Sequence, residues 1–315
     1  MGKERRRTML NSRIDFLKPD HRALADQGYH PVDMHIHTRY SDSYTHVGHL
    51  LRKARKKGFG VAITDHNEVK GVKDALSRKS DVLIIPGMEL TTFERAHLLF
   101  YFYDYHDLEA FYLKHVEKKK TANPYAFTNC HIQEIIDQGH SFNAIIAAAH
   151  PYSPSPMGIV RGIKRGYVPE SVLDSLDSIE VLCGTHTMKM NLNATKLALE
   201  TGKPFHGGSD AHTLMEVGKV VTYSEADEVG SFLDAIRRKK NLVMGKPTTT
   251  LMKLPAYATL SQKHLRYLRP TLKTKTVRTI KDGIAYHRPR VKAKVSTIKK
   301  RGKASLDNLS DKISG

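Results

Sequence analysis

Histidines and carboxylates gather at the ends of short apolar runs in this sequence. The first run ends in His35 and His37, the second leads into Asp65 and His66, and the third ends in Glu89. Imidazole nitrogens and carboxylate oxygens are ligands that proteins offer to Zn, Fe and Mn ions. One His-x-His pair is weak evidence, but so many polar groups in one pocket would otherwise need costly pairing. The pattern predicts a site for divalent metal.

The same pattern returns further along the chain. His97 opens the next apolar run, His150 closes another, and Asp210 and His212 follow a run that ends near residue 208. In a parallel α/β sheet or barrel, the C-terminal ends of the strands meet at one rim, where active sites are built. We therefore expect these side chains to converge on one pocket.

Strand-like and helix-like patterns alternate between residues 31 and 250. The predicted strands span 32–36, 61–64, 82–85, 98–103, 144–149, 178–182 and 219–223. The predicted helices span 49–57, 132–138, 193–201 and 230–240, and the first three end at Gly58, Gly139 and Gly202. This alternation predicts an α/β fold with a mainly parallel sheet, open or closed into a barrel. The runs 82–90 and 97–103 are too close for a helical crossover, which indicates a local irregularity.

Charge divides the chain unevenly. Its 315 residues include 51 Lys and Arg against 32 Asp and Glu, a net charge of +19. Residues 253–315 hold 17 Lys and Arg and 3 Asp and Glu, whereas 16 of the 18 histidines precede position 253. We therefore predict a lead-in over 1–30, a catalytic domain over 31–252 and a basic C-terminal segment over 253–315.

Cysteine usage and hydropathy bear on the compartment. The two cysteines, Cys130 and Cys183, argue against a disulfide framework and suit a reducing environment. No apolar stretch approaches the length of a membrane span, and the charged N-terminus lacks the apolar core of a signal peptide. These features predict a cytoplasmic protein with no transmembrane segment.

Taken together, the motifs resemble the PHP superfamily of metal-dependent phosphoesterases, which is named for polymerase and histidinol phosphatase. The resemblance covers roughly residues 31–250 and rests on His35-Ile36-His37-Thr38, Ser41-Asp42, Thr64-Asp65-His66-Asn67, Gly87-Met88-Glu89, His97, Ala149-His150-Pro151 and Ser209-Asp210-Ala211-His212. It implies a distorted (β/α)7 barrel, related to the TIM barrel, with a basic C-terminal extension. It also implies two or three divalent ions (Mn, Fe or Zn) at the rim.

The resemblance implies three groups of metal ligands. They are His35, His37, Glu89 and Asp210 for the first ion, a bridging Glu89 with His97 and His150 for the second, and Asp42, His66 and His212 for the third. It also implies that Asp65 orients a ligand or a pocket water. Glu89, Asp210 and Asp65 are therefore the catalytic candidates.

Two positions depart from the family pattern. The family often has Ser-Asp-Gly where this chain has Ser41-Asp42-Ser43, and His46 in the same loop is an alternative ligand to Asp42. The family also often has Asn after a Glu-apolar pair, where this chain has Cys183 after Glu180-Val181-Leu182. That second departure puts in doubt any substrate contact at this position.

Basic side chains near the motifs are candidates for binding phosphate. Arg39 follows the first motif, and Arg161, Lys164 and Arg165 follow the His150 motif. We predict that Arg39 and Arg161 bind the substrate phosphate. The alternative is that they are solvated loop charges.

Adjacent cations can bind phosphate oxygens, deprotonate a bridging water and stabilise the attacking and leaving oxygens. The sequence thus predicts a phosphoesterase that hydrolyses phosphate esters by attack of a metal-bound hydroxide. Its substrate would be a small phosphorylated metabolite, a nucleotide or an oligonucleotide end. The alternative is a non-catalytic metal-binding module associated with a nucleic-acid-processing machine.

The basic segment 253–315 has three readings from the sequence alone. Its Lys and Arg could contact nucleic acid, with Tyr257, Tyr267 and Tyr286 available for stacking. It could instead meet an anionic membrane surface, or remain a solvated tail. The sequence makes no prediction of oligomeric state.

Overall fold

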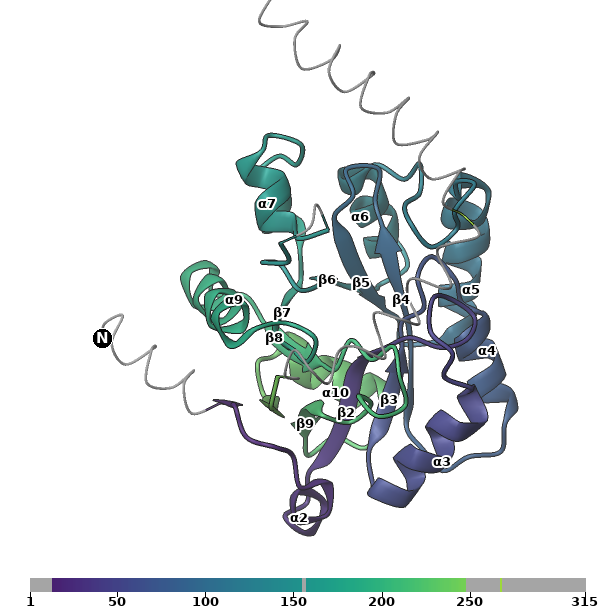
Figure 1. Ribbon diagram of the computed structural model, residues 1–315, viewed down its shortest axis with the longest axis vertical. Helices are drawn as coiled ribbons and strands as arrows, with labels where there is room; N and C mark the ends of the chain where they lie inside the picture. The colour runs from purple at the N-terminus through teal and green to yellow at the C-terminus, as the bar shows by residue number, and fades with distance from the viewer. Residues whose placement is uncertain (1–12, 155–156, 248–266, 268–315) are drawn as a thin grey trace, which may run out of the picture. The chain divides into compact units, whose positions relative to one another are not determined.

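A computed structural model describes residues 13–154, residues 157–247 and Tyr267 (Figure 1). Ten strands form one sheet in the order β1-β10-β9-β2-β3-β4-β5-β6-β7-β8. The strands are β1 Ile14–Asp15, β2 His30–Ile36, β3 Gly60–Ile63, β4 Ile84–Thr91, β5 His97–Tyr101, β6 Ile145–Ala148, β7 Ser178–Cys183, β8 Phe205–Gly208, β9 Val220–Ser224 and β10 Leu242–Gly245. The α-helices are α2 His21–Asp26, α3 Val47–Lys57, α4 Lys70–Ser77, α5 Tyr105–Phe111, α6 Ile132–His140, α7 Ile159–Lys164, α8 Val172–Ser175, α9 Met188–Thr201 and α10 Val229–Arg237.

The sheet is mixed and strongly curled. Five of its strand pairings are parallel and four are antiparallel, so the expected mainly parallel sheet is parallel in only part. Strand β5 is antiparallel to both β4 and β6, which is the irregularity expected between 82 and 103. After β8 the chain returns to β2, because Ala211 forms backbone hydrogen bonds with His35 and His37 at 3.3 and 3.0 Å. The result is a strongly curled half-barrel, consistent with the distorted barrel that the family resemblance implied.

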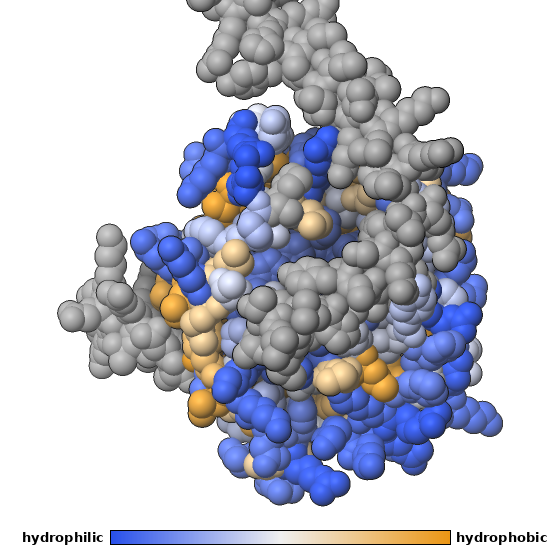
Figure 2. Space-filling view, in the orientation of Figure 1, coloured by the Kyte–Doolittle hydropathy of each residue, from blue (hydrophilic) through white to orange (hydrophobic). Residues whose placement is uncertain are grey.

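Helix α3 shows how the sequence builds the outer layer. Val47, Leu50, Leu51 and Ala54 recur at helical spacing and are buried. Basic residues fill the last turn, where they complement the helix dipole, and Gly58 ends the helix with φ of 75°. Helices α3, α4 and α5 lie along one side of the sheet (Figure 1), and their outward surface is largely hydrophilic (Figure 2).

One predicted helix end is wrong. The helix expected to stop before Gly139 continues to His140, with Gly139 inside it. A Cβ at Gly139 would lie 2.7 Å from Phe100 Cε1 of β5, so this glycine serves close packing of the helix on the sheet. By contrast, Gly202 ends α9 in the left-handed region, with φ of 64°, as predicted.

Alternation along β2 separates the core from the polar pocket. Val32 and Met34 are fully buried in one apolar cluster with Phe232, Leu233 and Ile236 of α10. Burying each such side chain contributes about 1.5–3 kcal/mol. Because neighbouring residues of a strand point to opposite faces, the packing of β2 on α10 turns Asp33 and His35 the other way.

Some expectations fall outside the described residues. The boundary near residue 252 and nearly all of the segment 253–315 lie there, so the domain division and the role of the basic segment stay predictions. Within residues 13–154 and 157–247, no helix has both the length and the apolar composition needed to cross a bilayer.

Candidate metal centre

The predicted ligands meet at the rim where β2, β3, β4, β6 and β8 end. Strand β5 runs against β4, so its first residue, His97, lies at this rim rather than its last. Each predicted ligand side chain belongs to a residue at most 7% exposed; the set is His35, His37, Asp42, His66, Glu89, His97, His150, Asp210 and His212. The curl of the sheet thus brings together residues far apart in sequence.

Four of these residues form a compact donor group. The Nε2 atoms of His35 and His37 lie 3.2 Å apart, and each lies 3.3 Å from Glu89 Oε2. Asp210 Oδ1 lies 3.5 Å from the first nitrogen and 3.2 Å from the second. Ligand atoms around one tetrahedral ion with bonds of about 2.0–2.2 Å are about 3.3–3.6 Å apart. The spacing of this group therefore suits a single divalent ion.

Glu89 belongs to two donor groups at once. Its Oε2 faces His35 and His37, while its Oε1 lies 2.7 Å from His97 Nδ1 and 3.0 Å from His150 Nε2. His66 Nδ1 also approaches Oε2, at 3.2 Å. A carboxylate whose two oxygens face different imidazole groups is suited to bridge two cations.

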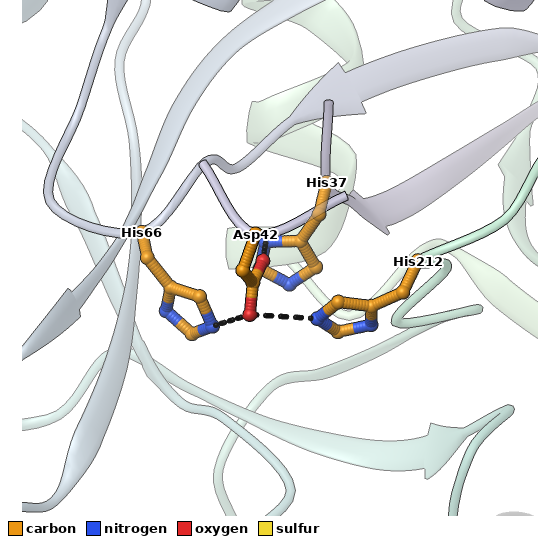
Figure 3. Close-up of side chains that lie close together, drawn as sticks. All are labelled: His37, Asp42, His66 and His212. Carbon is orange, nitrogen blue, oxygen red and sulfur yellow. Dashed lines mark ion pairs between the residues drawn. The ribbon is translucent and has the colours of Figure 1, made fainter. Parts of the chain in front are cut away.

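The third donor group surrounds Asp42 (Figure 3). Asp42 Oδ2 lies 3.4 Å from His66 Nε2 and 3.3 Å from His212 Nε2, and Asp42 Oδ1 lies 3.8 Å from His37 Nδ1. His37 thus stands between the first and third groups. The alternative ligand, His46, is exposed and its Nδ1 lies 3.2 Å from Arg39 Nη1, so the structure places Asp42 and not His46 in the cluster.

Two histidines show that these donors are set for a cation. His35 Nδ1 donates to Glu180 Oε1 at 2.9 Å, and His212 Nδ1 donates to the Asp210 carbonyl at 3.0 Å. When such a ring is neutral, as metal binding requires, its other nitrogen, Nε2, is an acceptor, and it faces carboxylate oxygens of Glu89, Asp210 or Asp42. Two acceptors at such distances repel unless a proton or a metal ion lies between them.

The two central carboxylates are ionised, as metal ligands must be. Burial alone would raise the pKa of Glu89, but the neighbouring imidazoles of His97, His66 and His35 hold it well below its usual value. The pKa of Asp210 is likewise well below its usual value, because His35 and His37 outweigh burial. Burial lowers the pKa of His66 to about 3, whereas contacts with Asp210 and Glu89 outweigh burial and raise the pKa of His37 to about 10. Metal binding would replace the proton on such a ring, because the neutral imidazole is the form that binds metal. The donor set therefore fits divalent metal.

Backbone strain accompanies two of the donors. His150 and Asp210 have φ of 26° and 52°, in the left-handed region that side chains other than glycine rarely adopt. Each such residue costs about 1–3 kcal/mol unless its surroundings hold it, and such residues cluster at functional sites. Both side chains lie in the same pocket as the other donors.

Comparison with known protein families decides the affiliation. The PHP domain matches residues 33–194, and a PHP-associated family matches residues 189–241. This chain belongs to the PHP family. Among curated proteins no match is found.

Solved structures share the PHP fold with this chain. A two-domain protein from Bacteroides vulgatus containing a predicted PHP-like metal-dependent phosphoesterase has a TM-score of 0.50 and 14% identity, over 74% of this chain and 68% of that one. PsfC from Pseudomonas syringae has a TM-score of 0.51 and 18% identity, over 75% and 98%. The lesion-specific endonuclease PfuEndoQ from Pyrococcus furiosus has a TM-score of 0.53 and 18% identity, over 68% and 57%. At these identities the likeness shows the fold alone.

Asp65 lies beside the PHP cluster rather than in it. Its Oδ1 accepts from Thr38 N at 2.7 Å and Ser41 Oγ at 2.6 Å, and its Oδ2 accepts from Thr38 Oγ1 at 2.6 Å. Burial raises its pKa. These contacts brace the loop that carries Asp42, so Asp65 is placed to orient a ligand.

The predicted phosphate-binding residues lie outside the donor groups. Arg39 is exposed, with its guanidinium 5.7 Å from the Tyr40 ring. Arg161 donates to the carbonyl of Pro154, and Lys164 and Arg165 are exposed. Their roles stay predictions.

Sequence reasoning missed the acids that support the cluster. Glu180 accepts from His35 Nδ1 and, at 2.6 Å, from His150 N. Asp33 accepts from Ser209 N and Oγ and from Gly218 N at 2.6–2.8 Å, and so ties β2 to the loop of Asp210. Each of these acids lies in the middle of an apolar run of the sequence. Because a buried carboxylate must be paired, this position could have indicated that it supports a polar site.

Proposed function

We propose that this chain is a metal-dependent phosphoesterase that hydrolyses phosphate esters with divalent ions bound at the rim. The observation that carries the proposal is the bridging position of Glu89 between two imidazole groups. The ligand assignment is that of the three groups above, with Asp42 rather than His46 in the third. Mn, Fe and Zn all accept this mixture of ligands.

The chain's own residues have distinct tasks in this proposal. His35, His37 and Asp210 would hold one ion with Glu89. His97 and His150, which contact the other oxygen of Glu89, would hold a second, and the negative charge of Glu89 would reduce the repulsion between the cations. When bound, such ions polarise phosphate oxygens and make water a nucleophile at neutral pH. Glu180 and Asp65 fix the positions of His35 and of the Asp42 loop.

The substrate remains one of three classes: a small phosphorylated metabolite, a nucleotide or an oligonucleotide end. A cavity of about 700 Å³, whose lining includes none of the donor residues, would suit an anionic part of a larger substrate. Its lining includes Lys18, Arg22, Lys53, Lys56, Lys57 and Lys219, and Asp20 is the acid among its described lining residues. A polyanion that reaches this cavity would gain affinity by counterion release, with a strong salt dependence.

A phosphate-release screen tests the proposal. The metal-stripped full chain is loaded with Mn, Fe or Zn and given a phosphate monoester, a phosphodiester, nucleotides and end-phosphorylated oligonucleotides. We expect metal-dependent release from at least one class, lost in Glu89→Gln and kept in Glu134→Gln, whose surface carboxylate pairs with Lys119 at 2.8 Å.

The alternative function gives a different result in the same screen. A non-catalytic metal-binding module would carry metal and release no phosphate from any substrate class. Full metal loading without hydrolysis would overturn the phosphoesterase and favour that module.

A further inference from the structure

A fourth donor group joins Asp210 to two residues outside the predicted ligand set, Cys183 at the end of β7 and His186 on the turn that follows. Cys183 Sγ lies 3.0 Å from His186 Nδ1 and 3.7 Å from Asp210 Oδ2. Thr185 Oγ1 lies 3.3 Å from the same sulfur and donates to Asp210 Oδ2 at 2.5 Å. A thiol, an imidazole and a carboxylate therefore meet at one point, with Cys183 and Asp210 buried and His186 partly exposed.

Asp210 connects this group to the main cluster, because only one of its two carboxylate oxygens faces the main cluster. Its Oδ1 faces His35 and His37, whereas its Oδ2 faces Thr185 and Cys183. The two oxygens thus serve different donor groups, as those of Glu89 do. A cation on the Oδ2 side would sit next to the predicted centre and share one carboxylate with it.

The turn that carries the thiol is held in place from two sides. Asn191 of α9 accepts from Cys183 N and donates to Cys183 O, both at 3.1 Å. A Cβ at Gly184 would lie 2.7 Å from Ser209 O, so glycine lets the turn press against the segment before Asp210. These contacts fix the sulfur relative to the carboxylate.

The imidazole is positioned as well. His186 stacks on His150, with ring centroids 5.0 Å apart and planes 10° from parallel. Two residues separate Cys183 from His186, as two to four separate paired cysteine ligands in structural zinc sites. Sulfur and nitrogen on one zinc ion would be about 3.5 Å apart, so a small rotation of the partly exposed His186 ring would admit the ion.

We propose that Cys183, His186 and Asp210 bind a thiophilic divalent cation such as zinc beside the predicted centre. Thiolate and imidazole are ligands that select such ions over Mg, Ca and Mn. Binding replaces the proton of the Cys183 thiol, and that proton leaves to solvent. The proposal does not depend on phosphate hydrolysis, because the site would bind the cation in the absence of substrate.

Cobalt absorption tests this site, because a thiolate bound to Co²⁺ gives an intense near-ultraviolet band. The metal-stripped full chain is titrated with Co²⁺. We expect the band in the wild type, its loss in Cys183→Ser, and its retention in Cys130→Ser. Cys130 is the matched control, since it is buried, its sulfur donates to the His115 carbonyl at 3.5 Å, and it belongs to no cluster of potential ligands among the described residues. We expect His186→Gln to weaken Co²⁺ binding about 10-fold or more.

A wild-type titration without the band, or a band that persists in Cys183→Ser, would overturn the proposal. If Cys183→Ser does not fold, zinc X-ray absorption of Cys130→Ser replaces it, because any sulfur ligand from cysteine must then be Cys183. One sulfur neighbour at about 2.3 Å supports the site, and nitrogen and oxygen neighbours alone refute it. Both measurements are made without substrate, so their outcome is independent of whether phosphate is released.

Discussion

Two kinds of buried carboxylate lie side by side in this molecule. Glu89 and Asp210 face mainly imidazole nitrogens at the rim. Asp33 and Asp65 are equally buried, but backbone N–H groups and hydroxyls satisfy both of their oxygens at 2.6–2.8 Å. The fold itself therefore satisfies the second pair with N–H and hydroxyl donors, while the first pair has the surroundings expected of metal ligands.

This difference distinguishes carboxylates that would bind metal from carboxylates that hold the surrounding loops in place. No hydrogen bond to Glu89 Oε2 forms within the described part of the chain, although the atom is buried. A buried carboxylate oxygen without a donor is costly, so a site that keeps one has a use for its charge. Asp33 and Asp65 instead hold the loops on which the ligands lie. Glu180 stands between the two kinds, since it accepts from both an imidazole and a backbone amide.

The largest effect is expected from Glu89→Gln. The substitution keeps the shape of the side chain and removes the charge that lets two cations sit together. We expect metal affinity to fall more than about 100-fold, beyond the 10–100-fold typical of removing an outer partner. Elemental analysis of variant and wild type, prepared alike, checks this. Metal content unchanged by Glu89→Gln would contradict the assignment of Glu89 as a metal ligand, and with it the distinction between the two pairs of carboxylates.

Glu180→Gln should have an intermediate effect. The amide can still accept from His35 Nδ1, but its NH₂ group would face the His150 N–H, which now donates to Glu180 Oε2. We expect metal affinity to fall about 10–100-fold. Competition with a chelator measures it, with Glu134→Gln as the control. A loss as large as that of Glu89→Gln would place Glu180 among the direct ligands.

Asp65→Ala should affect stability more than metal binding. It leaves three buried donors, on Thr38 and Ser41, without their acceptor. Each unsatisfied donor costs about 1–3 kcal/mol, so the free energy of unfolding of the metal-free chain should fall by about 3 kcal/mol or more. Denaturant unfolding checks this. If stability is unchanged and metal is lost, Asp65 belongs with Glu89 and not with Asp33.

The fold and the cluster were predictable to different degrees. Short apolar runs and their polar ends predicted β2, β3, β5, β6 and β7 within a few residues, because alternation and strand length are local properties. The convergence of His35, Glu89 and Asp210 followed from one rule, that strand ends share a rim.

What the sequence could not predict depends on tertiary contacts. Gly139 carries a helix-stop signal, but packing against Phe100 overrides it. The choice between Asp42 and His46 required the path of the loop, which Asp65 fixes through Thr38 and Ser41. The turn of Cys183 and His186 became visible only when β7 and the Asp210 loop lay together.

The smallest expected effect is on the pH dependence of stability. It concerns Glu68, a carboxylate outside the cluster whose oxygens accept hydrogen bonds. Glu68 accepts from Val69 N at 3.0 Å and Lys120 Nζ at 3.1 Å; burial alone would raise its pKa, but Lys120 and these donors lower it. A lowered pKa means that Glu68 stabilises the fold above its unfolded pKa of about 4.3 and loses this contribution as pH falls. We expect Glu68→Gln to cost about 1 kcal/mol at pH 7 and progressively less below pH 4.3. Unfolding curves at several pH values check this, and a pH-independent difference would contradict it.

The central claim is that the rim of this PHP chain holds more than one divalent ion. The most direct test is elemental analysis of the purified full chain after mild purification, and again after reconstitution with Mn, Fe or Zn. The donor groups around Glu89 and Asp42 predict more than one equivalent of metal per chain. A stoichiometry at or below one, unchanged by reconstitution, would contradict the account.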